Sequence, residues 1–167
     1  MRPGLSLLLA VIGGSVALPL DAATTSTFQV SATVTAGCLV VGGVSTWGTL
    51  DFGSHSALST GNVSTALGGT TVTLQCTPGV SLSMRLNGGQ NSAAGLRNLK
   101  RGSGTALVAY QLFADAGLSQ VLGIDQNVAV AYGDATAIKL PVYARAQLTG
   151  NLPAGSYTDV VQVVVSF

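Results

Sequence analysis

The stretch YTDVVQVVVSF, residues 157–167, alternates apolar and polar side chains and sets the fold class. Successive side chains of an extended chain point to opposite faces, so one face would carry Tyr157, Val161, Val163, Val165 and Phe167. The other face would carry Thr158, Val160, Gln162, Val164 and Ser166. Since a repeat of two residues is that of a β-strand, residues 157–167 are predicted to form a strand with one buried face.

A second alternating stretch, FQVSATVT, lies near the other end of the chain at residues 28–35. One face of it would carry Phe28, Val30, Ala32 and Val34, and the intervening polar residues would lie on the other. Gly37 and Cys38 follow directly and close the segment. Residues 25–35 are therefore predicted to be extended as well.

Strand patterns also recur between these two stretches. We predict further strands at residues 46–52, 70–76, 81–86, 106–114 and 135–144. Glycine, asparagine, aspartate and proline gather between them, which predicts hairpin turns at residues 87–89 and 133–134 and a turn at 153–155. This succession of short strands predicts an all-β sandwich.

The composition limits the possible functions. The 167 residues fit one domain. A formal net charge of +1 and 8% charged residues provide no broad positive field for nucleic acid or anionic lipid, so nucleic acid is not an expected partner. With 22 glycines beside so few charges, the chain is more typical of an assembled protein than of a soluble cytoplasmic enzyme.

The first residues are typical of an export signal. Arg2 precedes an apolar run at residues 5–12, and small residues follow. The run is too short to span a bilayer permanently, because a spanning helix needs about 20 apolar residues. Cleavage is expected near Ala17 or near Ala22, with the later site preferred, so residues 1–22 are assigned to the signal.

Two cysteines, Cys38 and Cys76, follow the expected signal. Because an exported chain meets oxidising conditions, they are expected to form one internal disulfide. Closing a loop of roughly 40 residues would stabilise the fold by about 4 kcal/mol in the chain-entropy model. The alternatives, a metal site or a reactive thiol, find little support, because the chain has no CxxC spacing and a single histidine. We expect no metal and no cofactor.

Residues for catalysis are few. His55 lies between two serines with Asp51 nearby, which supplies the residue types of a hydrolytic triad without a G-x-S-x-G turn for the nucleophile. We therefore expect no catalytic residues and no small-molecule substrate. The most polar stretch, residues 93–104, contains Arg97, Lys100 and Arg101, which we interpret as a solvated turn, with an anion-binding loop as the alternative.

The two alternating stretches suggest how the chain assembles. A hydrophobic strand at residues 157–167 belongs inside a sheet, and no strand follows it to cover its free edge. Residues 25–35 of another molecule would fit that edge as an added strand, bound by backbone hydrogen bonds and by alternate side chains. The alternative is that residues 25–35 form the first strand of their own sandwich, which would make an ordinary closed domain.

Several segments together resemble the spore coat U domain proteins, a family that includes subunits of archaic (Csu-type) chaperone-usher pili. They are VSATVTAGC at residues 30–38, GTLDFG at 48–53, VTLQC at 72–76, VAYQLFADA at 108–116 and AGSYTDVVQVVVSF at 154–167. Their order and spacing along almost the whole expected mature chain are more specific than any one segment.

The resemblance implies an incomplete immunoglobulin-like sandwich that lacks its last strand, with residues 37–167 as the pilin domain and residues 23–36 as an N-terminal donor segment. Phe28, Val30, Ala32 and Val34 would be donor residues. The acceptor groove would be lined by Val161, Val163, Val165 and Phe167. The implied partners are identical or related pilus subunits, a periplasmic chaperone and an outer-membrane usher, with export through the periplasm to the cell surface.

The leading hypothesis is thus a structural pilus subunit that polymerises by donor-strand complementation and serves surface adhesion and biofilm formation. A spore coat or cell-surface matrix protein that needs no usher is the alternative. A secreted hydrolase using Asp51 and His55 ranks below both.

Overall fold

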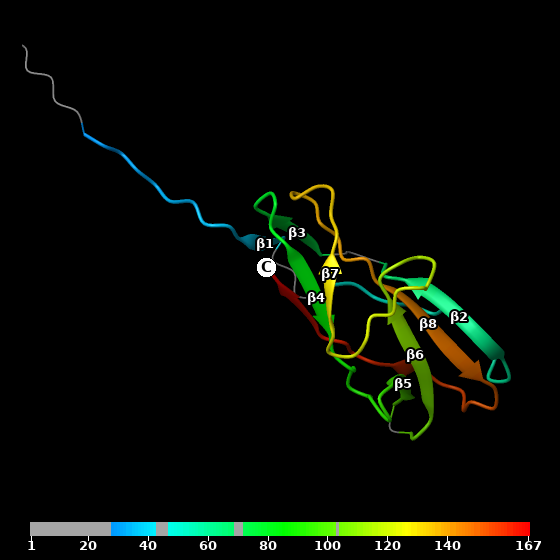
Figure 1. Ribbon diagram of the computed structural model, residues 1–167. Coiled ribbons are helices and arrows are strands. Elements are labelled where there is room, and N and C mark those ends of the chain that lie inside the picture. Colours follow the sequence, from blue (N-terminus) through cyan, green and yellow to red (C-terminus); the bar gives the residue numbers. More distant parts are fainter. Residues whose placement is uncertain (1–27, 43–46, 69–71, 103) are drawn as a thin grey trace, which may run out of the picture. The chain divides into compact units, whose positions relative to one another are not determined.

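The computed structural model describes residues 28–42, 47–68, 72–102 and 104–167, and this part of the chain folds into ten strands without a helix (Figure 1). The strands are β1 (Cys38–Val41), β2 (Thr60–Ala66), β3 (Thr73–Cys76), β4 (Leu82–Leu86), β5 (Arg97–Arg101), β6 (Leu107–Phe113), β7 (Asn127–Val130), β8 (Tyr143–Thr149), β9 (Tyr157–Thr158) and β10 (Val163–Ser166). The expected export signal, residues 1–22, lies outside the described residues. The prediction of an all-β chain is confirmed.

The folded unit begins at Thr35, and the chain before it, described from Phe28 on, is a separate unit. Within the folded unit the largest sheet has the order β2-β8-β6-β5-β9, a second has the order β10-β4-β7, and β1 pairs with β3. Every pair of neighbouring strands is antiparallel. Antiparallel sheets of this kind commonly bury one face and leave the other in solvent.

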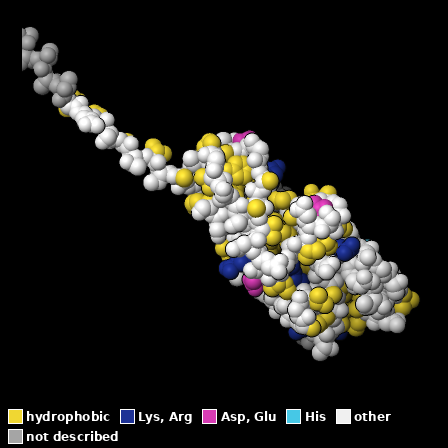
Figure 2. Space-filling model, viewed as in Figure 1, with side chains coloured by type: hydrophobic (Ala, Val, Ile, Leu, Met, Phe, Trp, Pro, Cys, Tyr) yellow, Lys and Arg dark blue, Asp and Glu magenta, His cyan; other side chains and the backbone are white. Residues whose placement is uncertain are grey.

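Alternate residues of the two larger sheets enter one core. On β4 these are Leu82, Met84 and Leu86, and on β6 they are Val108, Tyr110 and Leu112, all buried in a single cluster. Because the inward faces of both sheets contribute to it, the two sheets pack as a sandwich, as predicted. Figure 2 shows only scattered charged side chains among hydrophobic and neutral ones on the face in view.

Two predicted strands are wrong. Residues 47–52, the described part of the expected strand at 46–52, make only an isolated bridge between Thr49 and Gly68. Gly48 has a φ of 133°, which departs from strand geometry, and a Cβ there would lie 2.7 Å from the Gly68 oxygen, so this position requires glycine. The strand predicted at 135–144 begins only at Tyr143, after Pro141, which has no N–H to donate to a ladder.

Residues 87–89 and 133–134 lie in connections between strands, as predicted, but these connections join different elements from those expected. Residues 87–96 lead from β4 in one sheet to β5 in the other, and residues 131–142 lead from β7 to β8 across the sandwich. Neither turn is therefore a hairpin. Turn residues reveal that the chain changes direction, whereas the sheet it enters next depends on the packing of the whole domain.

Candidate functional site

The strand β10 lies at one edge of its sheet. It pairs with β4 in the register Val163 to Leu86 and Val165 to Met84, and in the described part of the chain no strand pairs with its other side. An unpaired edge presents a row of backbone N–H and C=O groups that can bind another strand. This edge is the candidate functional site.

The side chains along this edge alternate as predicted. Val161, Val163 and Val165 are partly buried against the core, whereas Val160 and Val164 are exposed. Phe167, placed by the sequence pattern on the inward face, is 65% exposed. The three inward valines thus still have apolar surface that a covering group would remove from water.

The strand predicted at residues 157–167 is divided between the two sheets. Its first part, β9, pairs with β5, and its last part, β10, pairs with β4. Asn87 holds the middle: its N–H donates to the Gln162 oxygen at 3.1 Å, and its side-chain oxygen accepts from the Gln162 N–H at 3.0 Å. These two hydrogen bonds fix the backbone at Gln162, between the part of the stretch that pairs with β5 and the part that pairs with β4.

Asp159 holds the segment between β9 and β10, where the chain passes from one sheet to the other. Its carboxylate accepts a hydrogen bond from the Tyr110 hydroxyl at 2.7 Å, and from the backbone and side-chain nitrogens of Asn91 at 3.1 Å each. Burial, followed by the hydrogen bond to Asp159, raises the pKa of Tyr110 well above its ordinary value, so the hydroxyl remains a donor. A side chain at Gly89 would collide with this carboxylate, which explains a glycine there.

Arg97 contradicts the interpretation of residues 93–104 as a solvated turn. It lies on β5, is 4% exposed, and its guanidinium donates to four backbone oxygens. These belong to Asn87 at 2.9 Å, Leu122 at 2.7 Å, Leu86 at 3.1 Å and Gly123 at 3.2 Å. Burial lowers the pKa of Arg97 from its ordinary value, and nearby Tyr110, Asp125 and Asp159 oppose that change. With these donors engaged, Arg97 is not available for an external anion.

The structure thus adds a polar cluster that sequence reasoning missed. Arg97 fixes the backbone at Leu86 and Asn87, Asn87 fixes Gln162, and Tyr110 with Asn91 fixes Asp159. Apart from Tyr110, whose ring lies in the core, the members of the cluster are polar, and the hydrophobic pattern carries no signal for them. Together these contacts position the segment that leads into the open edge of β10.

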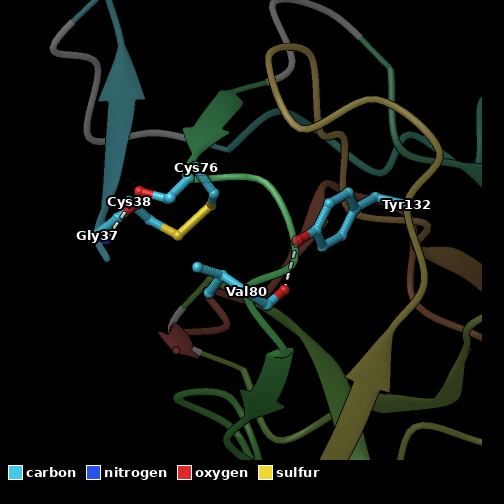
Figure 3. Close-up of a disulfide and its surroundings, with 6 residues drawn as sticks. Gly37, Cys38, Cys76, Val80 and Tyr132 are labelled. Atoms are coloured by element: carbon cyan, nitrogen blue, oxygen red, sulfur yellow. Dashed lines mark hydrogen bonds between the residues drawn. A yellow bond between two sulfur atoms is a disulfide. The ribbon is translucent and has the colours of Figure 1, made fainter. Parts of the chain in front are cut away.

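The predicted disulfide between Cys38 and Cys76 is confirmed, with an S–S distance of 2.09 Å. It joins the first residue of β1 to the last residue of β3 (Figure 3). The backbone continues the attachment, since the Thr77 N–H donates to the Gly37 oxygen at 2.9 Å. Close by in Figure 3, the Tyr132 hydroxyl donates to the Val80 oxygen. The start of the folded unit is therefore both covalently and noncovalently tied to β3.

Residues 28–34, the described part of the predicted donor segment, form no strand and are exposed. Phe28 is 87% exposed, Val30 81% and Val34 90%, and Ala32 is exposed as well. Exposed aliphatic and aromatic side chains at alternate positions are available to a partner, but their role as donors stays a prediction.

The hydrolase hypothesis finds no assembled site in the described residues. His55 is exposed, and its Nε2 lies 2.7 Å from the Phe52 oxygen. Asp51 accepts from the Gly53 N–H at 2.8 Å and so closes its own turn. Across the same residues, no group of three or more His, Cys, Asp or Glu side chains is placed to hold a metal. The described residues also contain no helix that has the length and apolar character to cross a membrane.

Comparison with known proteins identifies a family. Residues 24–164 match the family model of the spore coat protein U domain. No curated protein matches the sequence. Among solved structures, the chain is similar to one from the CsuC-CsuE chaperone–tip adhesion subunit pre-assembly complex of archaic chaperone-usher Csu pili of Acinetobacter baumannii, at 20% identity and a TM-score of 0.47.

A second similar structure is a chaperone–tip adhesin complex described as vital for activation of CFA/I fimbriae biogenesis, at 17% identity and a TM-score of 0.44. The matches cover 81% and 78% of this chain. They cover only 40% and 41% of the matched chains, so this chain spans less than half the length of either.

Proposed function

Since the chain belongs to the spore coat protein U domain family, we propose that it is a structural, non-enzymatic subunit of an extracellular chaperone-usher pilus. The observation that carries this proposal is the open edge of β10 beside three partly buried valines. On this proposal the edge accepts a strand donated by the N-terminal segment of the next subunit. The export signal at residues 1–22, the donor segment at 23–36 and the pilin domain at 37–167 are parts of the same proposal.

The acceptor side supplies two kinds of contact. The backbone of β10 provides hydrogen-bonding groups to a strand of any sequence, which gives affinity. The inward row of Val161, Val163 and Val165, with Phe167 beyond it, provides apolar contacts at alternate positions, which select the register. The cluster around Asp159 and Asn87 supports the role, because it holds the segment that precedes β10.

The N-terminal segment carries apolar side chains that suit the apolar row at the β10 edge. Phe28, Val30 and Val34 are exposed at alternate positions, and full burial of such a side chain is worth about 1.5–3 kcal/mol. Together they would contribute on the order of 5 kcal/mol or more, part of which is lost in ordering the segment. Ala32 offers little surface and would be the weakest of the four contacts.

The remaining parts of the proposal concern partners and location. Before assembly, a periplasmic chaperone would cover the β10 edge, and an outer-membrane usher would exchange it for the donor segment of the next identical or related subunit. The assembled fibre would lie outside the cell and serve surface adhesion and biofilm formation. These roles rest on the family and on the descriptions of the similar pilus complexes.

A pair of matched variants tests the donor role. Replacing Phe28, Val30 and Val34 by serine removes the apolar face of the segment, and replacing Gln29, Ser31 and Thr33 by alanine changes the opposite face to the same extent. Cells that express the chain with its cognate secretion proteins are examined by negative-stain electron microscopy. We expect filaments with the second variant and none with the first.

Filaments of normal length and number from the apolar-face variant would defeat the proposal. A soluble, stable monomer from the chain exported alone, without a chaperone, would instead favour a coat or matrix protein. The level of exported protein, measured by immunoblot, separates lost assembly from lost expression.

A further inference from the structure

A shallow hollow lies on the sheet of β2, β8, β6 and β5, away from the β10 edge. The described residues that line it are Asn62, Leu96, Ala109, Tyr110, Gln111, Arg145 and Gln147. On β8, Ala144 and Ala146 are buried, so Arg145 and Gln147 between and after them point away from the core. Register places Asn62 opposite Gln147 and Gln111 opposite Arg145, so polar side chains from three adjacent strands meet there.

Arg145 is the only charged residue among those lining the hollow that the structure describes. Its guanidinium lies over the Phe113 ring, 5.1 Å from the centroid, and donates one hydrogen bond of 3.3 Å to the Gln111 side-chain oxygen. Stacking and this contact restrict the guanidinium, while the described residues engage only one of its nitrogens and leave most of its five N–H donors available. A restricted guanidinium with free donors is suited to bind a carboxylate through two parallel hydrogen bonds.

Arg97 provides the contrast within the same sheet. Its guanidinium is buried and donates to four backbone oxygens. Arg145 faces outward beside neutral carboxamides instead. The second arginine therefore has a capacity for ligand binding that the first lacks.

The neighbours of Arg145 indicate the rest of the ligand. The carboxamides of Asn62, Gln111 and Gln147 each carry donors and an acceptor, which match the hydroxyl groups of a sugar. Leu96, which is exposed, and the small Ala109 supply apolar surface for the C–H face of a ring. Because the hollow lies on a sheet face, whose backbone groups are already paired in the ladders, an acidic peptide would find no strand edge there.

We propose that this hollow binds a carboxylated sugar unit of an acidic polysaccharide, with Arg145 on the carboxylate and the carboxamides on the hydroxyls. A shallow site of this size binds one unit weakly. Repeated along a fibre, it would bind a polysaccharide through many units at once, which raises the overall affinity without new contacts. Only the binding through many repeated sites rests on the proposed pilus function.

The test uses the full exported chain, purified alone or in complex with its chaperone, with tri-galacturonic acid as the probe and its methyl ester as the neutral match. Binding is followed by isothermal titration calorimetry and by chemical shifts of side-chain amides. We expect Arg145→Gln to weaken binding about tenfold or more, since a charge-assisted bidentate contact is lost. Arg85→Gln removes the same charge from an exposed position on β4 and is expected to leave binding unchanged.

Equal binding by the Arg145→Gln and unaltered chains, equal binding of the methyl ester, or no binding of tri-galacturonic acid at millimolar concentration would overturn the proposal. So would hexaglutamate binding as tightly through Arg145, which would indicate an acidic peptide. Filament formation by the Arg145→Gln variant is expected to be normal. Failure of this site and failure of the pilus proposal are thus distinguishable, because one is measured as sugar binding and the other as filaments.

Discussion

The two alternating stretches, residues 28–34 and 157–166, share one sequence pattern and differ in structure. The C-terminal one forms β9 and β10, with Val161, Val163 and Val165 packed against the core. The N-terminal one forms no strand in its described part, and its Phe28 and Val34 are exposed. An alternating pattern therefore determines which face of a segment can be buried, whereas the neighbours determine whether it is buried.

The largest expected effect comes from the disulfide, which ties the start of the folded unit to β3. Replacing both Cys38 and Cys76 by alanine should lower the free energy of unfolding by about 4 kcal/mol, because a 38-residue separation is no longer closed in the unfolded chain. Urea unfolding of the unaltered and variant chains, followed by circular dichroism, measures the difference. A variant as stable as the unaltered chain would show that β1 is held by its hydrogen bonds alone.

The second effect concerns the support of the C-terminal stretch. Arg97→Met should lower the free energy of unfolding by about 3 kcal/mol or more, because four backbone oxygens lose their donor. Arg97→Lys keeps a charge and some donors, so a smaller loss is expected. Hydrogen exchange at residues 157–166 should rise in the methionine variant. Unchanged exchange at residues 157–166 would contradict this prediction, because the C-terminal stretch would then keep its structure without the hydrogen bonds of Arg97.

A smaller effect should separate the two faces of β10. Val165→Ser should weaken binding of a synthetic peptide of residues 25–35 by about 1 kcal/mol, roughly fivefold, because less apolar surface is covered. Val164→Ser alters an exposed neighbour and is expected to leave binding nearly unchanged. Fluorescence anisotropy of the labelled peptide checks both. Equal losses in the two variants would contradict an acceptor row along the inward face.

The smallest effect lies in loops outside both stretches. Hydrogen bonds from Thr136 lower the pKa of Asp134, and those from Gln120 and Ser119 lower the pKa of Asp115. A carboxylate with a lowered folded-state pKa stabilises the fold fully above its ordinary pKa of 3.8, and this contribution is lost as the pH falls through the lower value. Unfolding measured from pH 5 to 2 should therefore lose less stability in Asp134→Asn. An identical acid profile would show that the Asp134 contacts do not persist in solution.

Much of the fold was predictable because strand patterns are local. The strands around residues 73–76, 82–86 and 107–113 lie within predicted segments, since each carries apolar residues at alternate positions. The strand β2, TGNVSTA, was missed because it is polar and mostly exposed. At the candidate site, the alternation of residues 161–165 was predicted correctly, and the division of the stretch between two sheets was not.

By itself, the sequence determined the all-β class, the pairing of Cys38 with Cys76 and the inward face of residues 161–165. Each depends on residues close in sequence or on a count of two cysteines. Only the tertiary structure decided that Arg97 is buried and Arg145 is not. The physical reason is that an arginine side chain can be buried only where acceptors surround its guanidinium. The oxygens that accept from Arg97 belong to residues 10 to 26 positions away, and they come together only when both sheets have packed.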